Sequence, residues 1–154
     1  MDALRARYRR VERLLATRWE RLRRAQDEIE AAQAGIGLRG KALDAAPRAS
    51  GGFGDPTARQ AAALAEARTR YDRAYAWVRL GRDIAIQLGD SFEGRVFDGC
   101  YADGLTEAGM ARREGCNRSR VKRARESIIQ LAALMAAERG LLGRKGDSAD
   151  EGDD

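Results

Sequence analysis

Basic side chains are concentrated between residues 105 and 125, in the segment LTEAGMARREGCNRSRVKRAR. The seven are Arg112, Arg113, Arg118, Arg120, Lys122, Arg123 and Arg125. With two glutamates in the same segment, its net charge is +5, equal to that of the whole chain. A dense cationic surface attracts polyanions through its field and through counterion release. This concentration of positive charge therefore favours polyanion binding. On charge alone, a solvated helical surface without a ligand stays open as the alternative.

The same segment has the pattern of two short helices joined by a tight turn. Thr106 and Asn117 are predicted N-caps of helices that end near Arg113 and Glu138. Gly115 supplies the positive φ that the turn needs. Small or apolar residues that would pack the two helices together are Met110, Ala111, Val121, Ala124, Ile128 and Leu131. We therefore predict a helix-turn-helix over about residues 105–125.

The exposed side of the second helix would contact nucleic acid. Arg118 and Arg120, near its start, are the candidates for base edges in the major groove. Asn117 is expected to cap the helix and also to reach a base. Phosphate contacts are expected from Ser119, Lys122, Arg123, Arg112 and Arg113.

These residues resemble region four of bacterial sigma factors. The resemblance rests on residues 101–106, Met110-Ala111, Gly115, 117–119 and 121–123. The layout of the whole chain is similar to the ArpU-like family of phage and prophage transcriptional regulators. Those proteins place a coiled hairpin, with a loop containing Gly and Pro, before a sigma-like helix-turn-helix.

Three residues depart from the sigma-like pattern. Glu114 stands where leucine is usual, Cys116 stands where valine is usual, and Gly109 lies inside the first motif helix. The resemblance implies a transcriptional regulator in the cytoplasm of a bacterial host cell. It would bind double-stranded DNA, and RNA polymerase is a candidate second partner. Two alternatives stay open: a small terminase-like DNA-packaging subunit, and a coiled-coil adaptor protein that binds no DNA.

Long helices are expected before the motif. Tyr8, Leu15, Leu22, Ile29 and Ile36 recur at every seventh residue, and Leu4, Val11, Arg18, Ala25 and Ala32 form a second row. This narrow stripe predicts one helix over residues 2–35 with a coiled-coil seam, rather than an amphipathic helix packed on a globular core. A loop is predicted over residues 37–54.

A second long helix is predicted over residues 56–88, with Asp55 as its N-cap and Pro56 at its first position. Leu64, Tyr71, Val78 and Ala85 form one sevenfold row, and Ala67, Ala74 and Gly81 form the other. Two matched helices favour an antiparallel coiled-coil hairpin over residues 1–88. An intermolecular coiled coil that gives a homodimer remains open beside it.

The fold class expected for the chain is therefore all-α. After Gly89, a capping box of Asp90 and Glu93 is expected to open a helix over residues 91–103. The helix-turn-helix domain would span residues 90–139. Residues 140–154 are expected to be a disordered acidic tail. A solubilising role for this tail is favoured over competition with DNA for the basic helix.

Enzyme, metal and membrane functions are not expected. The chain has no histidine, which is the commonest metal ligand and general base. Cys100 and Cys116 are interpreted as small buried hydrophobes with reduced thiols, because two cysteines do not make a zinc site. The run 51–54 lacks the lysine and hydroxyl residue of a P-loop. The charged N-terminus is unlike a signal peptide, and no apolar run is long enough to span a membrane.

Overall fold

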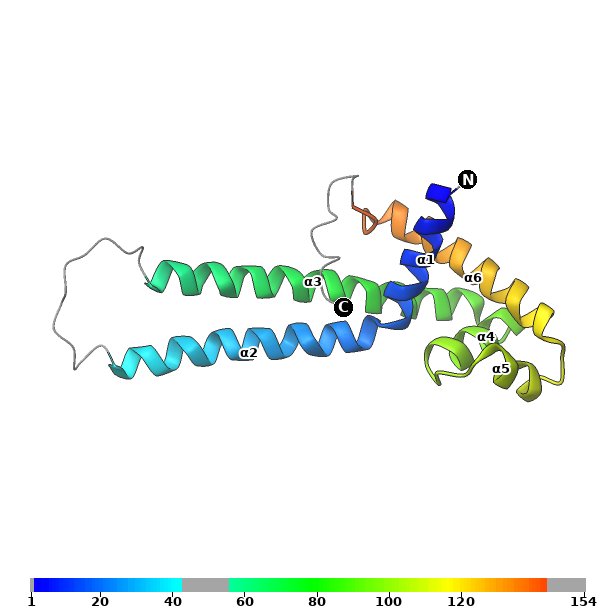
Figure 1. The fold of residues 1–154 in the computed structure, drawn as a ribbon, viewed down its shortest axis with the longest axis horizontal. Helices are drawn as coiled ribbons and strands as arrows, with labels where there is room; N and C mark the ends of the chain where they lie inside the picture. The colour runs from blue at the N-terminus through cyan, green and yellow to red at the C-terminus, as the bar shows by residue number, and fades with distance from the viewer. Residues whose placement is uncertain (1, 43–55, 144–154) are drawn as a thin grey trace. The chain divides into compact units, whose positions relative to one another are not determined.

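The computed structural model describes residues 2–42 and 56–143 (Figure 1). Within these residues the chain forms six helices and no strand, which confirms the all-α class. The helices are α1 (Asp2–Ala16), α2 (Arg18–Ala42), α3 (Pro56–Leu88), α4 (Phe92–Tyr101), α5 (Glu107–Arg113) and α6 (Arg118–Glu138).

Contacts divide the described chain into two compact units. The first unit contains residues 2–17 and 76–143, and the second contains residues 18–42 and 56–75. Helix α3 contributes residues to both units. The division therefore falls at other positions than the boundary expected near residue 88.

The first predicted helix is interrupted at Thr17, so the expectation of one helix over residues 2–35 is wrong. The Thr17 hydroxyl donates a hydrogen bond to the carbonyl oxygen of Arg13 at 2.9 Å. The Thr17 amide also donates to that carbonyl, at 3.0 Å. A threonine hydroxyl that bonds back to the preceding turn commonly bends a helix. A sevenfold apolar pattern does not register such a break.

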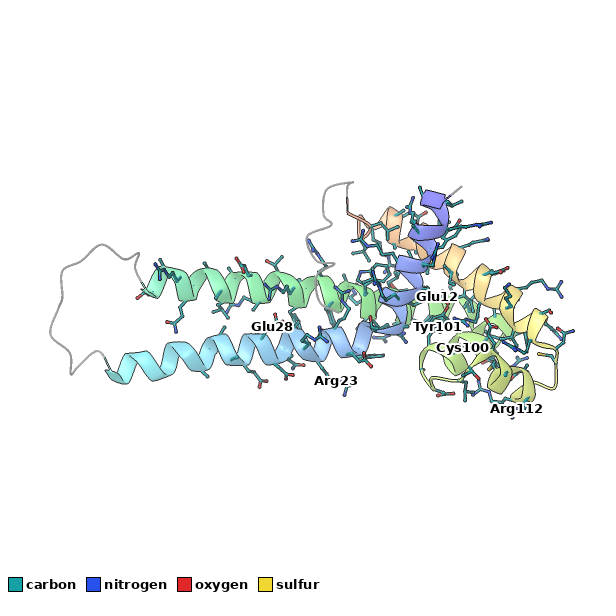
Figure 2. All side chains as sticks on the ribbon, viewed as in Figure 1. Glu12, Arg23, Glu28, Cys100, Tyr101 and Arg112 are labelled. Carbon is teal, nitrogen blue, oxygen red and sulfur yellow. The ribbon has the colours of Figure 1, made fainter. Side chains whose placement is uncertain are left out.

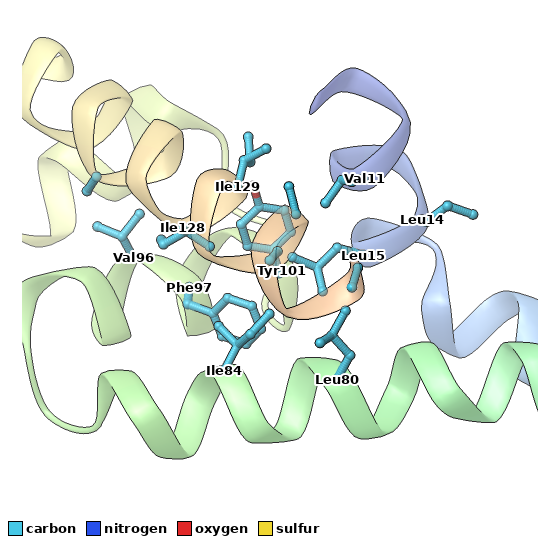
Figure 3. Packing of buried hydrophobic residues seen from close by; sticks show 14 of the residues in the cluster. Val11, Leu14, Leu15, Leu80, Ile84, Val96, Phe97, Tyr101, Ile128 and Ile129 are labelled. Atoms are coloured by element: carbon cyan, nitrogen blue, oxygen red, sulfur yellow. The ribbon is translucent and has the colours of Figure 1, made fainter. Parts of the chain in front are cut away.

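The core of the first unit is built from five helices (Figure 3). Its largest fully buried side chains are Val11 and Leu15 of α1, Leu80 and Ile84 of α3, Val96 of α4, Met110 of α5, and Val121 and Ile128 of α6. Helix α6 contacts α1, α4 and α5. It is therefore the central helix of this unit.

The sevenfold stripe of α1 faces this core rather than a coiled-coil seam. Val11 and Leu15 are fully buried among core side chains of α3, α4 and α6, whereas Leu4 of the same stripe is 55% exposed. The expectation that α1 continues a coiled-coil seam is therefore wrong. Helix α1 is instead an amphipathic helix packed on a globular core. The sequence pattern does not distinguish this arrangement from a coiled coil, because the apolar faces of both repeat at nearly the same spacing.

In the second unit, α2 and the first part of α3 run alongside each other in opposite directions (Figure 1). Ala25, Ala67 and Ala74 are buried there, and an ion pair of 2.9 Å joins Arg70 to Glu28. Helix α2 continues to Ala42, beyond the predicted start of the loop at residue 37. The rest of that loop and Asp55 lie outside the described residues.

Helix ends in the first unit follow local turn chemistry. Gly89, Gly104 and Gly115 have φ values of 50°, 69° and 61°, in the left-handed region where glycine is least strained. Ser91 caps α4, because its hydroxyl accepts the amide of Gly94 at 3.0 Å. The predicted cap at Asp90 is therefore one residue too early, and α4 ends at Tyr101 rather than at residue 103.

The chain just after α6 is also more ordered than expected. Gly140 ends the helix with a φ of 67°, and the amide of Leu141 donates to the carbonyl oxygen of Ala136 at 2.9 Å. Leu141 and Leu142 pack against the core. Residues 140–143 are therefore not part of a disordered tail. The acidic residues assigned to it lie outside the described residues.

Two glycine-to-alanine changes are expected to act in opposite directions on stability. A Cβ at Gly94 would lie 2.0 Å from the Gly89 carbonyl oxygen, and a Cβ at Gly109 would meet nothing closer than 3.5 Å. Gly94→Ala should lower the free energy of unfolding by about 1–3 kcal/mol through the clash. Gly109→Ala should raise it by roughly 0.5–1 kcal/mol, because alanine favours the helix. Urea unfolding followed by circular dichroism measures both, and equal effects would contradict the close approach at Gly94.

Candidate nucleic-acid interface

Helices α5 and α6 are joined by a short turn whose geometry matches the predicted caps. The Thr106 hydroxyl accepts the Gly109 amide at 3.1 Å, and the Asn117 side-chain oxygen accepts the Arg120 amide at 2.8 Å. The Cys116 amide donates to the Ala111 carbonyl oxygen at 2.9 Å and closes the turn around Gly115. Both N-caps predicted from the sequence are confirmed.

The structure places all of the predicted contact residues at the surface of α5, the turn and α6. Arg112, Arg113, Asn117, Arg118, Ser119, Arg120, Lys122 and Arg123 are exposed. Arg112 is labelled on α5 in Figure 2. Exposure alone does not make a side chain available to a ligand, so the partners of each cation decide its role.

Four cations on this surface have weak partners or none. The guanidinium of Arg118 lies 3.8 Å from the Glu107 carboxylate, and 71% of the Arg118 side chain is exposed. Arg123 donates a 3.4 Å hydrogen bond to the carbonyl oxygen of Ser119 in its own helix. The side chains of Arg112 and Lys122 have no partner among the described residues. These four side chains are free to move toward an anion.

Arg120 is held by an aromatic ring. Its guanidinium lies 4.3 Å from the centroid of Phe92, and Arg95 lies over the same ring at 5.9 Å. Such cation–π contacts contribute about 0.5–1 kcal/mol at exposed sites. The contact orients Arg120 against the start of α4 while its side chain stays exposed.

Arg113 is a structural residue in this fold. Its guanidinium donates to the Asp103 carboxylate at 2.8 Å and to the carbonyl oxygen of Arg95 at 3.0 Å. It also lies so close to Gly99 that a Cβ there would come within 2.6 Å of the guanidinium. Arg113 therefore helps to join α5 to α4, and its expected phosphate contact stays a prediction.

Glu114 explains one departure from the sigma-like pattern. Only 14% of its side chain is exposed, and its carboxylate accepts a 2.8 Å bond from Arg95. Arg95 also donates to the carbonyl oxygen of Asp90 at 2.8 Å. An ion pair therefore joins the end of α5 to α4 at the position where the pattern expects an apolar contact.

Arg125 is the centre of an ionic cluster that joins three helices. Its guanidinium pairs with Glu107 of α5 at 2.9 Å and with Glu12 of α1. It lies 6.0 Å from the ring centroid of Tyr101 of α4. Figure 2 labels Glu12 and Tyr101 in this region. Arg125 therefore belongs to the interior contacts of the unit and not to its cationic surface.

The sequence contained a signal for this cluster that charge counting missed. Val121, Arg125, Ile128 and Ala132 follow one another at spacings of three and four, which places them on one face of a helix. Val121, Ile128 and Ala132 are buried. A cation on such a face requires partners, which here are the carboxylates of Glu12 and Glu107.

Burial changes the ionisation of the groups in this cluster. Burial raises the pKa of Tyr101 to about 12, although the neighbouring Arg125 acts in the opposite direction. Burial alone would lower the pKa of Arg125, but its polar contact with Tyr101 and the charges of Glu12 and Glu107 shift it upward overall. Burial also raises the pKa of the Cys100 thiol.

Cys100 and Cys116 are free and half-buried, not fully buried as expected.

The charge around the candidate interface is lower than the segment count implies. Residues 90–125 contain eight basic and six acidic residues, a net charge of +2. Arg113 and Arg125 are occupied by ion pairs. The attraction for a polyanion therefore depends on the local grouping of Arg112, Arg118, Lys122 and Arg123.

The described residues contain no group of three or more acidic or cysteine side chains placed to hold a metal ion. None of their helices is long and apolar enough to cross a membrane.

The raised pKa of Tyr101 predicts a loss of stability at high pH. Because the folded-state pKa of about 12 lies above the ordinary tyrosine pKa of 10.0, folding favours the neutral phenol. This contribution is complete below pH 10 and is lost as the pH rises to 12. The difference in unfolding free energy between the wild type and Tyr101→Phe should change by roughly 2–3 kcal/mol over that range.

Urea unfolding at several pH values measures this difference, with Tyr75→Phe as the control because Tyr75 is exposed. The control should follow the wild-type profile. Parallel profiles for Tyr101→Phe and the wild type would contradict the assignment.

The chain matches no protein-family model, and it matches no curated protein and no solved structure. The resemblance to sigma-factor region four and to ArpU-like regulators therefore stays a prediction from the motif residues and from the layout of the chain.

Proposed function

We propose that this protein is a sequence-specific DNA-binding transcriptional regulator of phage or prophage type. The observation that carries the proposal is the group of exposed cations on α5 and the first turns of α6. The opposite faces of these helices are packed in the core. The helix-turn-helix formed by α5, the turn and α6 would place the start of α6 in the major groove of double-stranded DNA.

The contacts of each side chain within the protein indicate whether it is available for a base contact or for a phosphate contact. Arg118 has only a long contact to Glu107, so it is the residue proposed to reach a guanine edge. Arg112, Lys122 and Arg123 are proposed to hold phosphates. Ser119 is proposed to add a phosphate contact, and Asn117 to add a contact beside its cap. The amide groups at the start of α6 add a partial positive charge toward the DNA.

Arg120 has a more restricted role in this proposal. Its stacking on Phe92 fixes the position of its guanidinium at the side of α6 that faces α4. A base contact by Arg120 would require it to leave the ring, which costs the cation–π contact. We therefore assign base reading to Arg118 first.

The second unit is proposed to form a coiled-coil hairpin from α2 and α3. Its role in the proposed function is to contact a protein, either RNA polymerase or a second copy of the chain. The exposed Trp19 and Tyr75 supply apolar surface for such a contact, since aromatic side chains are enriched at interfaces.

Two alanine substitutions should separate base reading from phosphate binding. Arg118→Ala should weaken binding to the preferred site by about 1–3 kcal/mol and reduce discrimination between sites. Lys122→Ala should weaken binding to all sequences alike and lower the salt slope of log K by about one. Fluorescence anisotropy with duplexes selected from fragments of the source genome, at several salt concentrations, measures both effects.

Arg82→Ala is the matched control, because Arg82 is an exposed arginine of α3 outside the proposed interface. It should leave affinity and discrimination unchanged. If Arg118→Ala kept full discrimination, the base contact would be misassigned. If neither variant bound more weakly, the whole surface would be misassigned. If the wild type showed no affinity for DNA at low salt, the protein would be better described as an adaptor that binds no DNA.

The assembly state distinguishes transcription from DNA packaging. A transcriptional regulator with a hairpin contact is expected to be a monomer or a dimer. Small terminase subunits combine a DNA-binding helical motif with an oligomerising coiled coil and form rings. Sedimentation velocity measures the mass, and a ring of many subunits would contradict the transcriptional role while leaving DNA binding intact.

A further inference from the structure

A second cationic surface lies on the first unit, between α1 and the segment that follows α6. It is an open hollow of about 730 Å³. Its lining residues are Ala6, Arg7, Arg9, Arg10, Arg13, Leu142 and Gly143. We call this surface the arginine hollow. Arg10 is half-buried and the other three arginines are exposed.

The arginines of the hollow have no anion beside them in the described chain. No ion pair or hydrogen bond joins their guanidinium groups to another described residue. Arg9 and Arg10 lie four and three residues before Arg13, so they share one face of α1. Like charges at this spacing repel each other and destabilise a helix by a few tenths of a kcal/mol per pair. An anion placed in the hollow would relieve this repulsion.

The described chain ends at the hollow. Gly143, its last described residue, lines the same surface as the arginines, and Figure 1 shows the end of α6 beside α1. Residues 144–154 follow directly, with two basic and five acidic residues and a net charge of −3. The acidic residues are Asp147, Asp150, Glu151, Asp153 and Asp154.

Chain length favours the hollow over the opposite end of α6 as the place for the nearest of these acids, Asp147 and Asp150. Asp147 is four residues beyond Gly143, which allows it to lie at most about 14 Å away. Helix α6 has 21 residues, so Arg118 lies about 30 Å from its C-terminal end. Asp147 therefore cannot reach the proposed DNA surface, whereas Arg7, Arg9, Arg10 and Arg13 lie around Gly143 itself.

We propose that the arginine hollow binds the acidic C-terminal segment of the same chain, residues 147–154. The acids neutralise the arginines of α1 and leave the cations of α5 and α6 as the accessible basic surface. This assignment differs from competition between the tail and DNA at α6. It also holds whether or not the protein binds DNA.

Site-resolved arginine modification tests the proposal in the full chain. Phenylglyoxal labels accessible guanidinium groups, and peptide mass spectrometry gives the rate at each arginine. The test variant carries Asp147→Asn, Asp150→Asn, Glu151→Gln, Asp153→Asn and Asp154→Asn together. At low salt, labelling of Arg7, Arg9, Arg10 and Arg13 should become at least about threefold faster than in the wild type, because several weak ion pairs are lost together. High salt should remove the difference.

Arg82, Arg118 and Arg123 report on other surfaces in the same experiment. Their labelling rates should not change. A matched control variant removes exposed acids of α2 instead, through Glu20→Gln, Asp27→Asn and Glu30→Gln, and should label like the wild type. Faster labelling of Arg118 and Arg123 instead of the α1 arginines would place the tail on α6. Unchanged labelling at all of these arginines would show that the hollow does not bind the tail. Either result overturns the proposal.

Discussion

The contacts of Arg125 constrain the rest of the first unit. One guanidinium joins Glu12 of α1, Glu107 of α5 and the ring of Tyr101 of α4. About a quarter of its side chain is exposed, so the charges are only partly screened by water. Removing one partner of such a cluster leaves a poorly solvated charge behind, and for that reason its members depend on one another. The cluster fixes the position of α6, the central helix of the unit, against three other helices.

This constraint separates structural arginines from those that can act on a ligand. Arg125 and Arg113 lie in the same basic segment as Arg118, but their guanidinium groups already donate to acidic side chains or carbonyl oxygens of the protein. Glu107 connects the two classes, because its carboxylate pairs closely with Arg125 and only loosely with Arg118. Arg118 is therefore positioned near the start of α6 without being held there. A side chain in this state can exchange its partner for a base or a phosphate at little cost.

Local chemistry was predictable from the sequence, and contacts between distant residues were not. The caps at Thr106 and Asn117 and the turn at Gly115 follow from the preferences of single residues, and the structure has all three. The burial of Val11 depends on which helices pack on α1, and a sevenfold pattern fits both a coiled coil and a globular core. The break at Thr17 is a local effect of a threonine hydroxyl, and the sevenfold pattern does not register it. The charge count did not show that Arg113 and Arg125 are occupied, because Asp103 and Glu12 lie outside the counted segment and the pairing of Arg125 with Glu107 depends on how α5 and α6 pack.

The acidic residues near the candidate interface restrict how a polyanion can approach it. Helix α4 and its flanking turns carry Asp90, Glu93, Asp98 and Asp103, and of these only Asp103 is engaged by a basic segment residue, Arg113. Phosphates that approach over α4 would meet these carboxylates and be repelled. Approach over the outer faces of α5 and α6 meets Arg112, Lys122 and Arg123 instead. The small net charge of this region is therefore a sum of separated charges, with carboxylates on α4 and cations on α5 and α6. Repulsion on one side and attraction on the other would both favour a single docking direction for a nucleic acid.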